Sequence, residues 1–259
     1  MIDIGANLTD KRFHADLPEV IDRAKATGLE HIIVTGTSIN SARSAQLLCD
    51  KYPEYLSCTV GVHPHDASHF EERDYAVLKE LAQHPAVVAI GETGLDYNRN
   101  FSPAKAQRFA FEQQIQLAVE TQLPLFLHER EAEKDLIDTI NPYLSQLKGA
   151  VVHCFTGDKT TLYRYLDMGL YIGITGWVCD ERRGLPLLEL VTKIPDDRIL
   201  LETDAPYLLP RNLSPKPKKG RNEPSFLPHV AATIANVKGI STQSLIDKAT
   251  QNTRLLFNL

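Results

Sequence analysis

The sequence alternates short apolar runs with longer amphipathic segments along almost its entire length. Eight runs have the length and composition of buried strands: Ile2–Leu8, His31–Thr37, Leu56–His63, Val87–Glu92, Leu125–His128, Ala150–Phe155, Tyr171–Thr175 and Ile199–Thr203. Helices are expected at Leu17–Thr27, Ser41–Lys51, Tyr75–Gln83, Ala104–Thr121, Glu131–Leu147, Thr160–Met168, Leu185–Lys193, Leu227–Val237 and Thr242–Phe257. Eight strand–helix units predict a (β/α)8 TIM barrel, formed as one domain over all 259 residues.

A doubly wound open sheet is the rival fold, because periodicity alone cannot show whether a sheet closes. The first predicted strand is not followed by GxGxxG, and no linker-like stretch divides the chain. These two observations favour the barrel. A barrel carries its active site at the C-terminal ends of its strands.

The composition is that of an ordinary globular protein, with 43% hydrophobic and 24% charged residues. A net charge of −5 argues against attraction of the whole molecule to nucleic acid, so a basic site must be local. The four cysteines lack CxxC spacing, the N-terminus does not resemble a signal peptide, and no apolar run approaches membrane-spanning length. We therefore expect a cytoplasmic monomer without a membrane segment.

Four predicted strands end in residues that suit chemistry better than packing. Glu92 and His128 close the fourth and fifth strands, His153 lies near the end of the sixth, and Asp204 follows the eighth. In a barrel these positions converge on one face. Two imidazoles and two carboxylates in one pocket favour a divalent ion, with Zn²⁺, Mn²⁺ and Mg²⁺ as candidates. We predict that these four residues bind a metal ion.

Four motifs resemble the signatures of the TatD family of metal-dependent deoxyribonucleases. They read Gly-Val-His-Pro-His at 61–65, Ile-Gly-Glu-Thr-Gly-Leu-Asp-Tyr at 90–97, His-Cys-Phe-Thr-Gly at 153–157 and Glu-Thr-Asp-Ala-Pro-Tyr at 202–207. The resemblance implies an amidohydrolase-like barrel that cleaves DNA, as a 3′–5′ exonuclease on single strands with RNA as a further substrate, in DNA repair or degradation. It also places the four predicted ligands on the family's metal positions.

The first strand departs from the family pattern, which has His-x-His at its end. Here the same place reads Gly5-Ala6-Asn7, so both imidazoles are missing. Asn7 can offer only a carbonyl oxygen. We therefore expect one firmly held ion and a second, weakly held ion that arrives with substrate, and we expect Mg²⁺ to be preferred over Mn²⁺ or Zn²⁺.

Phosphodiester hydrolysis assigns roles to the predicted catalytic residues. Glu92 is the central carboxylate, and Asp204 serves as both ligand and general base. Glu202 lies on the same side of its strand as Asp204 and one layer deeper, where it either orients a ligand histidine or is a satisfied buried carboxylate. His63 holds phosphate or donates a proton, and Asp96 either assists the metal or forms a turn.

Basic and aromatic residues near the strand ends suggest the substrate. From Arg211 to Glu223 the chain has five basic residues and one acid. A basic groove with aromatic platforms is typical of single-strand recognition, although a solvated loop and core aromatics would give the same composition. The predicted substrate-binding residues are His65, Arg99, Arg130, Trp177, Tyr207, Lys216, Lys218, Lys219 and Arg221.

Two other functions remain open from the sequence. A related metal-dependent amide or ester hydrolase, such as an aminoacyl-tRNA deacylase, would use the same strand-end ligands but would not need the basic, aromatic rim. A barrel that only binds a partner would tolerate missing ligands, and the first strand lacks two. The rim favours a nuclease over the first alternative, and the four intact ligand positions argue against the second.

Overall fold

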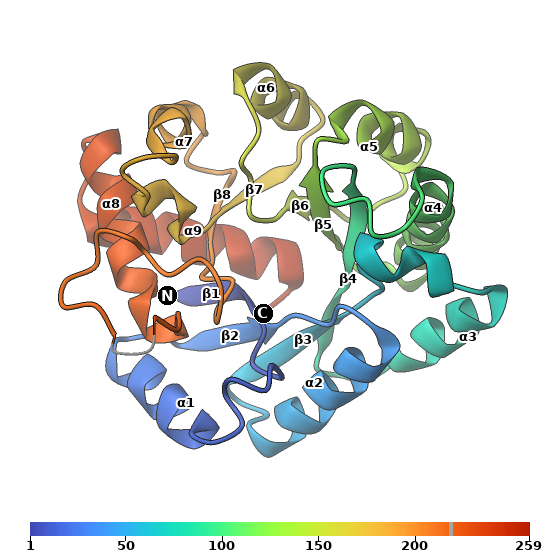
Figure 1. Ribbon diagram of the computed structural model, residues 1–259, viewed down its shortest axis with the longest axis horizontal. Helices are drawn as coiled ribbons and strands as arrows, with labels where there is room; N and C mark the ends of the chain where they lie inside the picture. Colours follow the sequence, from blue (N-terminus) through green and yellow to red (C-terminus); the bar gives the residue numbers. More distant parts are fainter. Residues whose placement is uncertain (218–219) are drawn as a thin grey trace. The chain divides into compact units, whose positions relative to one another are not determined.

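The computed structural model describes residues 1–217 and 220–259 (Figure 1). The chain divides into two compact units. The first unit contains Met1–Val34, Cys154–Leu255 and Leu259, and the second contains Thr35–His153 and Leu256–Asn258. Each unit consists of parallel strands that alternate along the chain with helices.

All eight predicted strands are present. The first unit has β1 (Ile2–Ala6), β2 (His31–Val34), β7 (Tyr171–Ile174) and β8 (Ile199–Leu201), and the second has β3 (Leu56–Val60), β4 (Val87–Asp96), β5 (Leu125–Arg130) and β6 (Ala150–Val152). In the first unit β1 pairs with β2, β7 pairs with β8, and Ala6 forms a parallel bridge with Ala205. In the second unit β3 to β6 pair in chain order. The parallel pairing agrees with the predicted (β/α)8 fold.

The helices also follow the predicted order. They are α1 (Leu17–Ala26), α2 (Ile39–Lys51), α3 (Glu72–Leu81), α4 (Ala104–Thr121), α5 (Glu133–Ile140), α6 (Lys159–Asp167), α7 (Leu185–Leu190), α8 (Leu227–Lys238) and α9 (Thr242–Phe257). The bounds predicted for α4 and α9 are confirmed. Helix α5 was predicted to run to Leu147 but ends at Ile140. Pro142 lacks an N–H and cannot donate the next hydrogen bond of an α-helix, and a short 3-10 turn follows at Asn141–Tyr143.

Strand β4 is longer than the sequence suggested. We expected it to end at Glu92, with breaks at Gly91 and Gly94, but it continues to Asp96 and all ten of its residues are buried. Both glycines have positive φ. A Cβ added at Gly91 would lie 2.2 Å from the carbonyl oxygen of Phe126, and one at Gly94 would lie 2.0 Å from that of His128. The glycines therefore let β4 approach β5 closely rather than end the strand.

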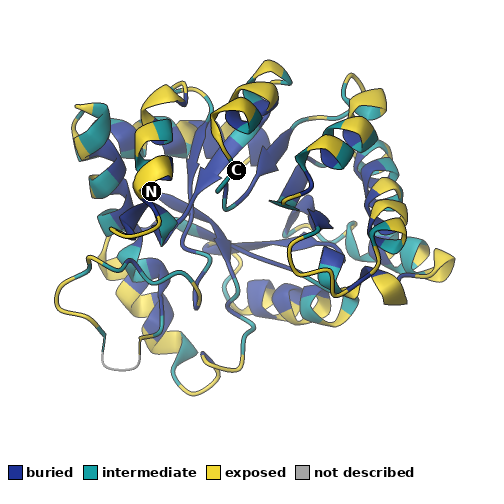
Figure 2. Cartoon of the chain, turned by 45° about the horizontal axis from the view of Figure 1, so that its top comes forward, coloured by how far each residue is buried: buried dark blue, intermediate teal, exposed yellow. Residues whose placement is uncertain are grey.

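The strands provide the core of each unit, while the helices carry the exposed surface (Figure 2). The burial pattern of β4 is continuous rather than alternating, as expected for a parallel strand covered on both faces. All four cysteines are free. Among the described residues, no helix combines the length and the apolar character needed to cross a membrane.

Gly94 gives a test of this close approach. We expect Gly94→Ala to lower the free energy of unfolding by roughly 2–5 kcal/mol, since overpacking and backbone strain each cost about 1–3 kcal/mol. Gly169→Ala is the matched control, because Gly169 also has positive φ but has nothing within 4 Å of an added Cβ. Denaturant unfolding of both variants measures the difference. Equal losses of unfolding free energy in the two variants would show that a Cβ at Gly94 fits between β4 and β5.

Candidate metal centre

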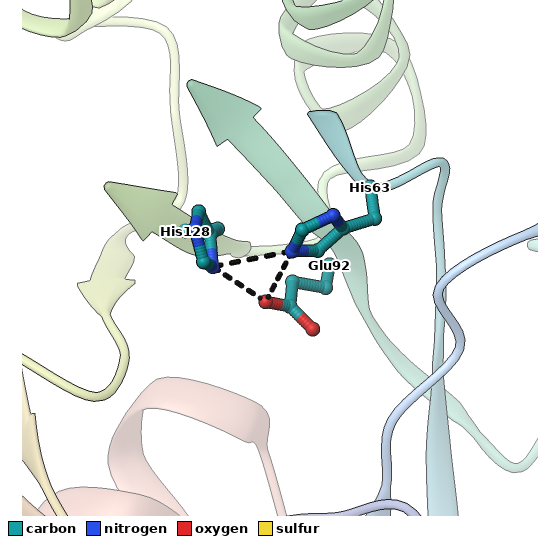
Figure 3. Close-up of side chains that lie close together, drawn as sticks. All are labelled: His63, Glu92 and His128. Carbon is teal, nitrogen blue, oxygen red and sulfur yellow. Dashed lines mark hydrogen bonds and ion pairs between the residues drawn. The ribbon is translucent and has the colours of Figure 1, made fainter. Parts of the chain in front are cut away.

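Glu92 lies on β4 with one carboxylate oxygen facing two imidazoles (Figure 3). Its Oε1 is 3.2 Å from Nε2 of His63 and 2.9 Å from Nδ1 of His128. The two imidazole nitrogens are themselves 3.2 Å apart. His63 follows β3 and His128 lies on β5, so three neighbouring strands of the second unit supply the group. One ligand atom from each residue lies within 4.8 Å of the others, which is close enough to surround one metal ion.

His153, directly after β6, reaches the same oxygen of Glu92. Its Nε2 lies 2.7 Å from Glu92 Oε1, and its ring stacks on Phe126 with 4.7 Å between the ring centroids. The predicted convergence of Glu92, His128 and His153 is therefore present in the second unit. His63, which we predicted as a catalytic or phosphate-binding residue, belongs to the same cluster and is a fourth candidate ligand.

Asp96, at the end of β4, connects this cluster to His65. Its Oδ2 lies 2.7 Å from His65 Nε2 and 3.3 Å from His128 Nε2, while its Oδ1 accepts the backbone N–H of Arg99 at 2.8 Å. The residue therefore does both things that the sequence left open: it caps a turn and it contacts a candidate ligand. Sequence reasoning undervalued Asp96 because it expected β4 to end before it.

The protonation of the cluster follows from burial and charge together. Burial raises the pKa of Glu92, but the charges of His153 and His63 and the hydrogen bonds from His128 outweigh this effect, so the pKa lies well below its ordinary value. Burial lowers the pKa of His63. Burial also lowers the pKa of His128, but hydrogen bonds to Asp96 and Glu92 raise it more. These directions favour an ionised Glu92 and a neutral His63, the forms that bind metal, whereas the raised pKa of His128 favours a proton that a metal ion would displace.

Asp204 lies in the first unit, where the ends of β1 and β8 hold it. Its backbone N–H donates to Gly5 O at 2.9 Å, and its Oδ1 accepts the side-chain amide of Asn7 at 2.9 Å. Asp204 has a positive φ of 54°, so these contacts hold a conformation that is uncommon for a non-glycine residue. Whether Asp204 completes a ligand set with Glu92, His128 and His153 stays a prediction.

Two buried carboxylates support this region of the first unit. Asp3 accepts the backbone N–H of Thr203 at 3.0 Å and its hydroxyl at 2.5 Å, and burial raises the pKa of Asp3 to about 7. Glu202 is fully buried and accepts the backbone N–H of Cys154, the residue that follows His153. This contact satisfies the buried carboxylate of Glu202, and the alternative that Glu202 orients a ligand histidine stays a prediction.

Two arginine–aromatic pairs lie in the first unit. The Arg12 guanidinium lies 4.2 Å from the ring centroid of Tyr207, and that of Arg183 lies 4.6 Å from the ring of Trp177. Tyr207 and Trp177 were predicted as substrate-binding residues, whereas Arg12 was not, because nothing in the local sequence connects it to Tyr207. Asp10 binds Arg12 through both carboxylate oxygens, at 2.9 and 2.8 Å.

The remaining predicted substrate contacts differ in their surroundings. Arg99 and Lys216 are exposed, and Arg130 is half-buried at the end of β5. Lys218 and Lys219 lie outside the described residues. Arg221 has acidic and aromatic partners: its guanidinium donates to Asp16 and Glu223, each at 2.7 Å, and lies 4.9 Å from the ring of Phe13. These ion pairs offset the charge of Arg221 and connect its loop to the start of α1.

Comparison with known proteins identifies the family. The profile of the family described as TatD related DNase matches residues 2–258. The chain belongs to the TatD-related DNase family. It is 52% identical over 259 residues to the "3'-5' ssDNA/RNA exonuclease TatD" of Rahnella sp. (strain Y9602), covering 100% of this chain and 98% of that protein. It is 51% identical to the protein of the same name from Edwardsiella piscicida, with 100% of both chains covered.

Solved structures of the TatD family share the fold. A TatD family hydrolase from Entamoeba histolytica matches with a TM-score of 0.89 at 30% identity, covering 99% of this chain and 97% of that one. YJJV, a TatD homologue from Escherichia coli K12, matches with a TM-score of 0.91 at 25% identity, covering 100% and 98%. These comparisons confirm the family predicted from the motifs and the TIM-barrel fold class.

Substituting one histidine of the cluster tests its role in metal binding. We expect His128→Ala to weaken divalent-ion binding by at least about 100-fold, more than the loss of a residue that only orients a ligand, while the protein stays folded. His84→Ala is the control, because His84 also faces a carboxylate, Asp50 at 3.3 Å, but lies outside the cluster. Calorimetry measures binding and circular dichroism measures folding. A folded His128→Ala protein with unchanged ion affinity would remove His128 from the ligand set.

Proposed function

We propose that this protein is a metal-dependent 3′–5′ exonuclease that hydrolyses phosphodiester bonds in single-stranded DNA and RNA. The observation that carries the proposal is the approach of three imidazole nitrogens to one carboxylate oxygen of Glu92 in a chain of the TatD-related DNase family. Relatives at about half identity carry the name of such an exonuclease. The proposed alternative, an amide or ester hydrolase, finds no support among them.

The residues of the cluster fit a divalent metal ion. The donor set joins imidazole nitrogens to a buried, ionised carboxylate, and this chemistry suits Zn²⁺, Mn²⁺ and Mg²⁺. A bound ion would lower the pKa of the attacking water and offset charge on the phosphate. His63, Glu92, His128 and His153 would hold it, with Asp204 as a further ligand.

The protein groups around the metal position have separable tasks in hydrolysis. Asp204 would accept the proton of the attacking water, since Gly5 holds its backbone and the side-chain amide of Asn7 orients its carboxylate. His65 is held by Asp96 and is 30% exposed, so it can reach a phosphate oxygen or protonate the leaving group. Glu202 fixes the backbone after His153.

The substrate contacts proposed for a single strand are basic and aromatic. Arg99 and Lys216 offer exposed cations for phosphates, and Tyr207 and Trp177 offer rings that already pack against arginine. Stacking and phosphate contacts do not distinguish the sugar, which suits a substrate range of both DNA and RNA. Arg130, Lys218 and Lys219 remain proposed contacts, while the ion pairs of Arg221 favour a structural role.

End-labelled oligonucleotides test the proposed activity. Metal-stripped protein is incubated with 5′-labelled and 3′-labelled single and double strands of DNA and RNA, and Mg²⁺, Mn²⁺ or Zn²⁺ is then added separately. We expect a 5′ label to appear in progressively shorter fragments and a 3′ label to be released at once as a mononucleotide, on single strands. His128→Ala protein, prepared in parallel, controls for contaminating nucleases. Absence of cleavage with every ion, together with deacylation of aminoacyl-tRNA, would favour the alternative hydrolase.

The missing imidazoles of strand β1 predict an unusual metal stoichiometry. We propose that the free protein holds one ion firmly and that a second ion, preferably Mg²⁺, binds together with substrate phosphate. Calorimetry should then give one tight ion for the free protein and two in the presence of a non-cleavable single strand. Gly5→His with Asn7→His should tighten the second site and shift its preference toward Zn²⁺ or Mn²⁺. Two tight ions in the unmodified free protein would contradict this proposal.

Three other predictions do not concern the site. A cytoplasmic location, a monomeric state and a role in DNA repair or degradation stay predictions from the sequence and the family resemblance.

A further inference from the structure

We propose that Phe101 is the stacking platform for a base that flanks the scissile phosphodiester bond. The inference rests on the proposed nuclease function and adds a substrate-positioning residue to it. Phe101 lies in the loop 97–103 between β4 and α4 and exposes 66% of its surface. A single exposed apolar residue is common on protein surfaces and by itself indicates nothing. Phe101 differs from such a residue in the anchoring of its loop and in the rings that it contacts.

The loop that carries Phe101 is anchored at both ends by one buried side chain. The amide of Gln107 accepts the backbone N–H of Asp96 at 2.8 Å and donates to Asp96 O at 3.0 Å and to Ser102 O at 2.7 Å. Ser102 is fully buried, and its hydroxyl donates to His65 O at 2.8 Å. The backbone on both sides of Phe101 is therefore fixed. The ring is held in an exposed position by a firmly anchored loop.

Phe101 is the outer member of a row of rings that leads into the metal centre. Its ring centroid lies 4.7 Å from that of His65 in an edge-to-face arrangement, and the His65 centroid lies 4.2 Å from that of His63. His63 in turn faces Glu92 and His128. All of these residues belong to the second unit. A phosphodiester group at the metal centre would thus have an exposed aromatic ring two side chains away, within reach of the base of a flanking nucleotide.

The charge beside the ring fits a nucleotide better than an apolar partner. Arg99 lies two residues earlier in the same loop and is exposed, and its backbone N–H is fixed by Asp96 at 2.8 Å. An aromatic face beside a cation matches a base and its phosphate. Because every base has a π-face, such a platform demands a base without selecting its sequence. It is also indifferent to the 2′-hydroxyl, so DNA and RNA should depend on it equally.

Phe109 provides a matched control within the same unit. It is also an exposed phenylalanine, with 42% of its surface accessible, and it also meets another ring edge-on, Phe70 at 6.1 Å between centroids. It lies on α4, and the ring it meets belongs to Phe70 rather than to a histidine of the metal cluster. Any general cost of removing an exposed phenylalanine should therefore appear in both variants.

The experiment combines protein variants with substrates that lack one base. Wild-type, Phe101→Ala, Phe101→Leu, Phe101→Tyr and Phe109→Ala proteins are compared on single strands with an abasic site at the 3′-terminal or the penultimate position, and on intact strands. For intact strands we expect Phe101→Ala and Phe101→Leu to raise KM about tenfold with kcat retained, since stacking a base on an aromatic side chain strengthens binding roughly 5- to 150-fold. Phe101→Tyr keeps the ring and should behave as wild type.

The abasic substrates decide between stacking and other effects. At the position whose base uses the platform, removal of the base should raise KM for wild-type protein about tenfold and should have no further effect on Phe101→Ala. Ion affinity measured by calorimetry should be equal in all variants. If Phe101→Ala and Phe109→Ala give the same KM, or if the effects of Phe101→Ala and base removal add at both positions, the inference is overturned. Absence of cleavage by wild-type protein would instead contradict the proposed nuclease function.

Discussion

The chemistry of this protein depends on a carboxylate that is almost completely buried and is still kept ionised. Glu92 exposes only 6% of its surface, and an isolated buried charge is unstable unless other groups compensate it. Imidazoles of His63, His128 and His153 provide that compensation, all at one oxygen atom. A metal ion bound between these groups would compensate the charge of Glu92 in place of the imidazoles. The proposed metal affinity would therefore follow from how Glu92 is buried.

Burying Glu92 in this way requires backbones to approach more closely than side chains normally allow. A Cβ at Gly61 would lie 2.5 Å from the carbonyl carbon of Gly91, and one at Gly91 would lie 2.2 Å from Phe126 O. The glycine directly after β3 and the glycine on β4 thus bring His63, Glu92 and His128 within ligand distance. The same close approach lets β4 continue to Asp96, which then binds His65 and His128 from one carboxylate oxygen. The close approach of these backbones therefore determines both the length of β4 and the positions of the site residues.

The sequence predicted the order of the elements and the strand-end residues, because both depend on local periodicity and on the rules of parallel sheets. It placed Glu92, His128 and His153 together correctly. It predicted too early an end for β4, since in a sequence a glycine that permits close packing cannot be told from one that ends a strand. It could not anticipate that Arg221 pairs with Asp16, 205 positions away, or that Arg12 lies over Tyr207. Contacts between distant segments leave no periodic signal.

The replacement of the family's first histidines changes how Asp204 is held rather than leaving it unsupported. Asn7 donates one neutral hydrogen bond to Asp204, and its own backbone N–H is fixed by Ala205 O at 2.7 Å. A neutral amide stabilises the carboxylate less than an imidazolium or a metal ion would. A carboxylate in this state attracts a hard cation and accepts a proton readily. Under the proposed function, the absence of the two imidazoles would weaken a permanent second metal site and would leave Asp204 basic enough to accept a proton from water.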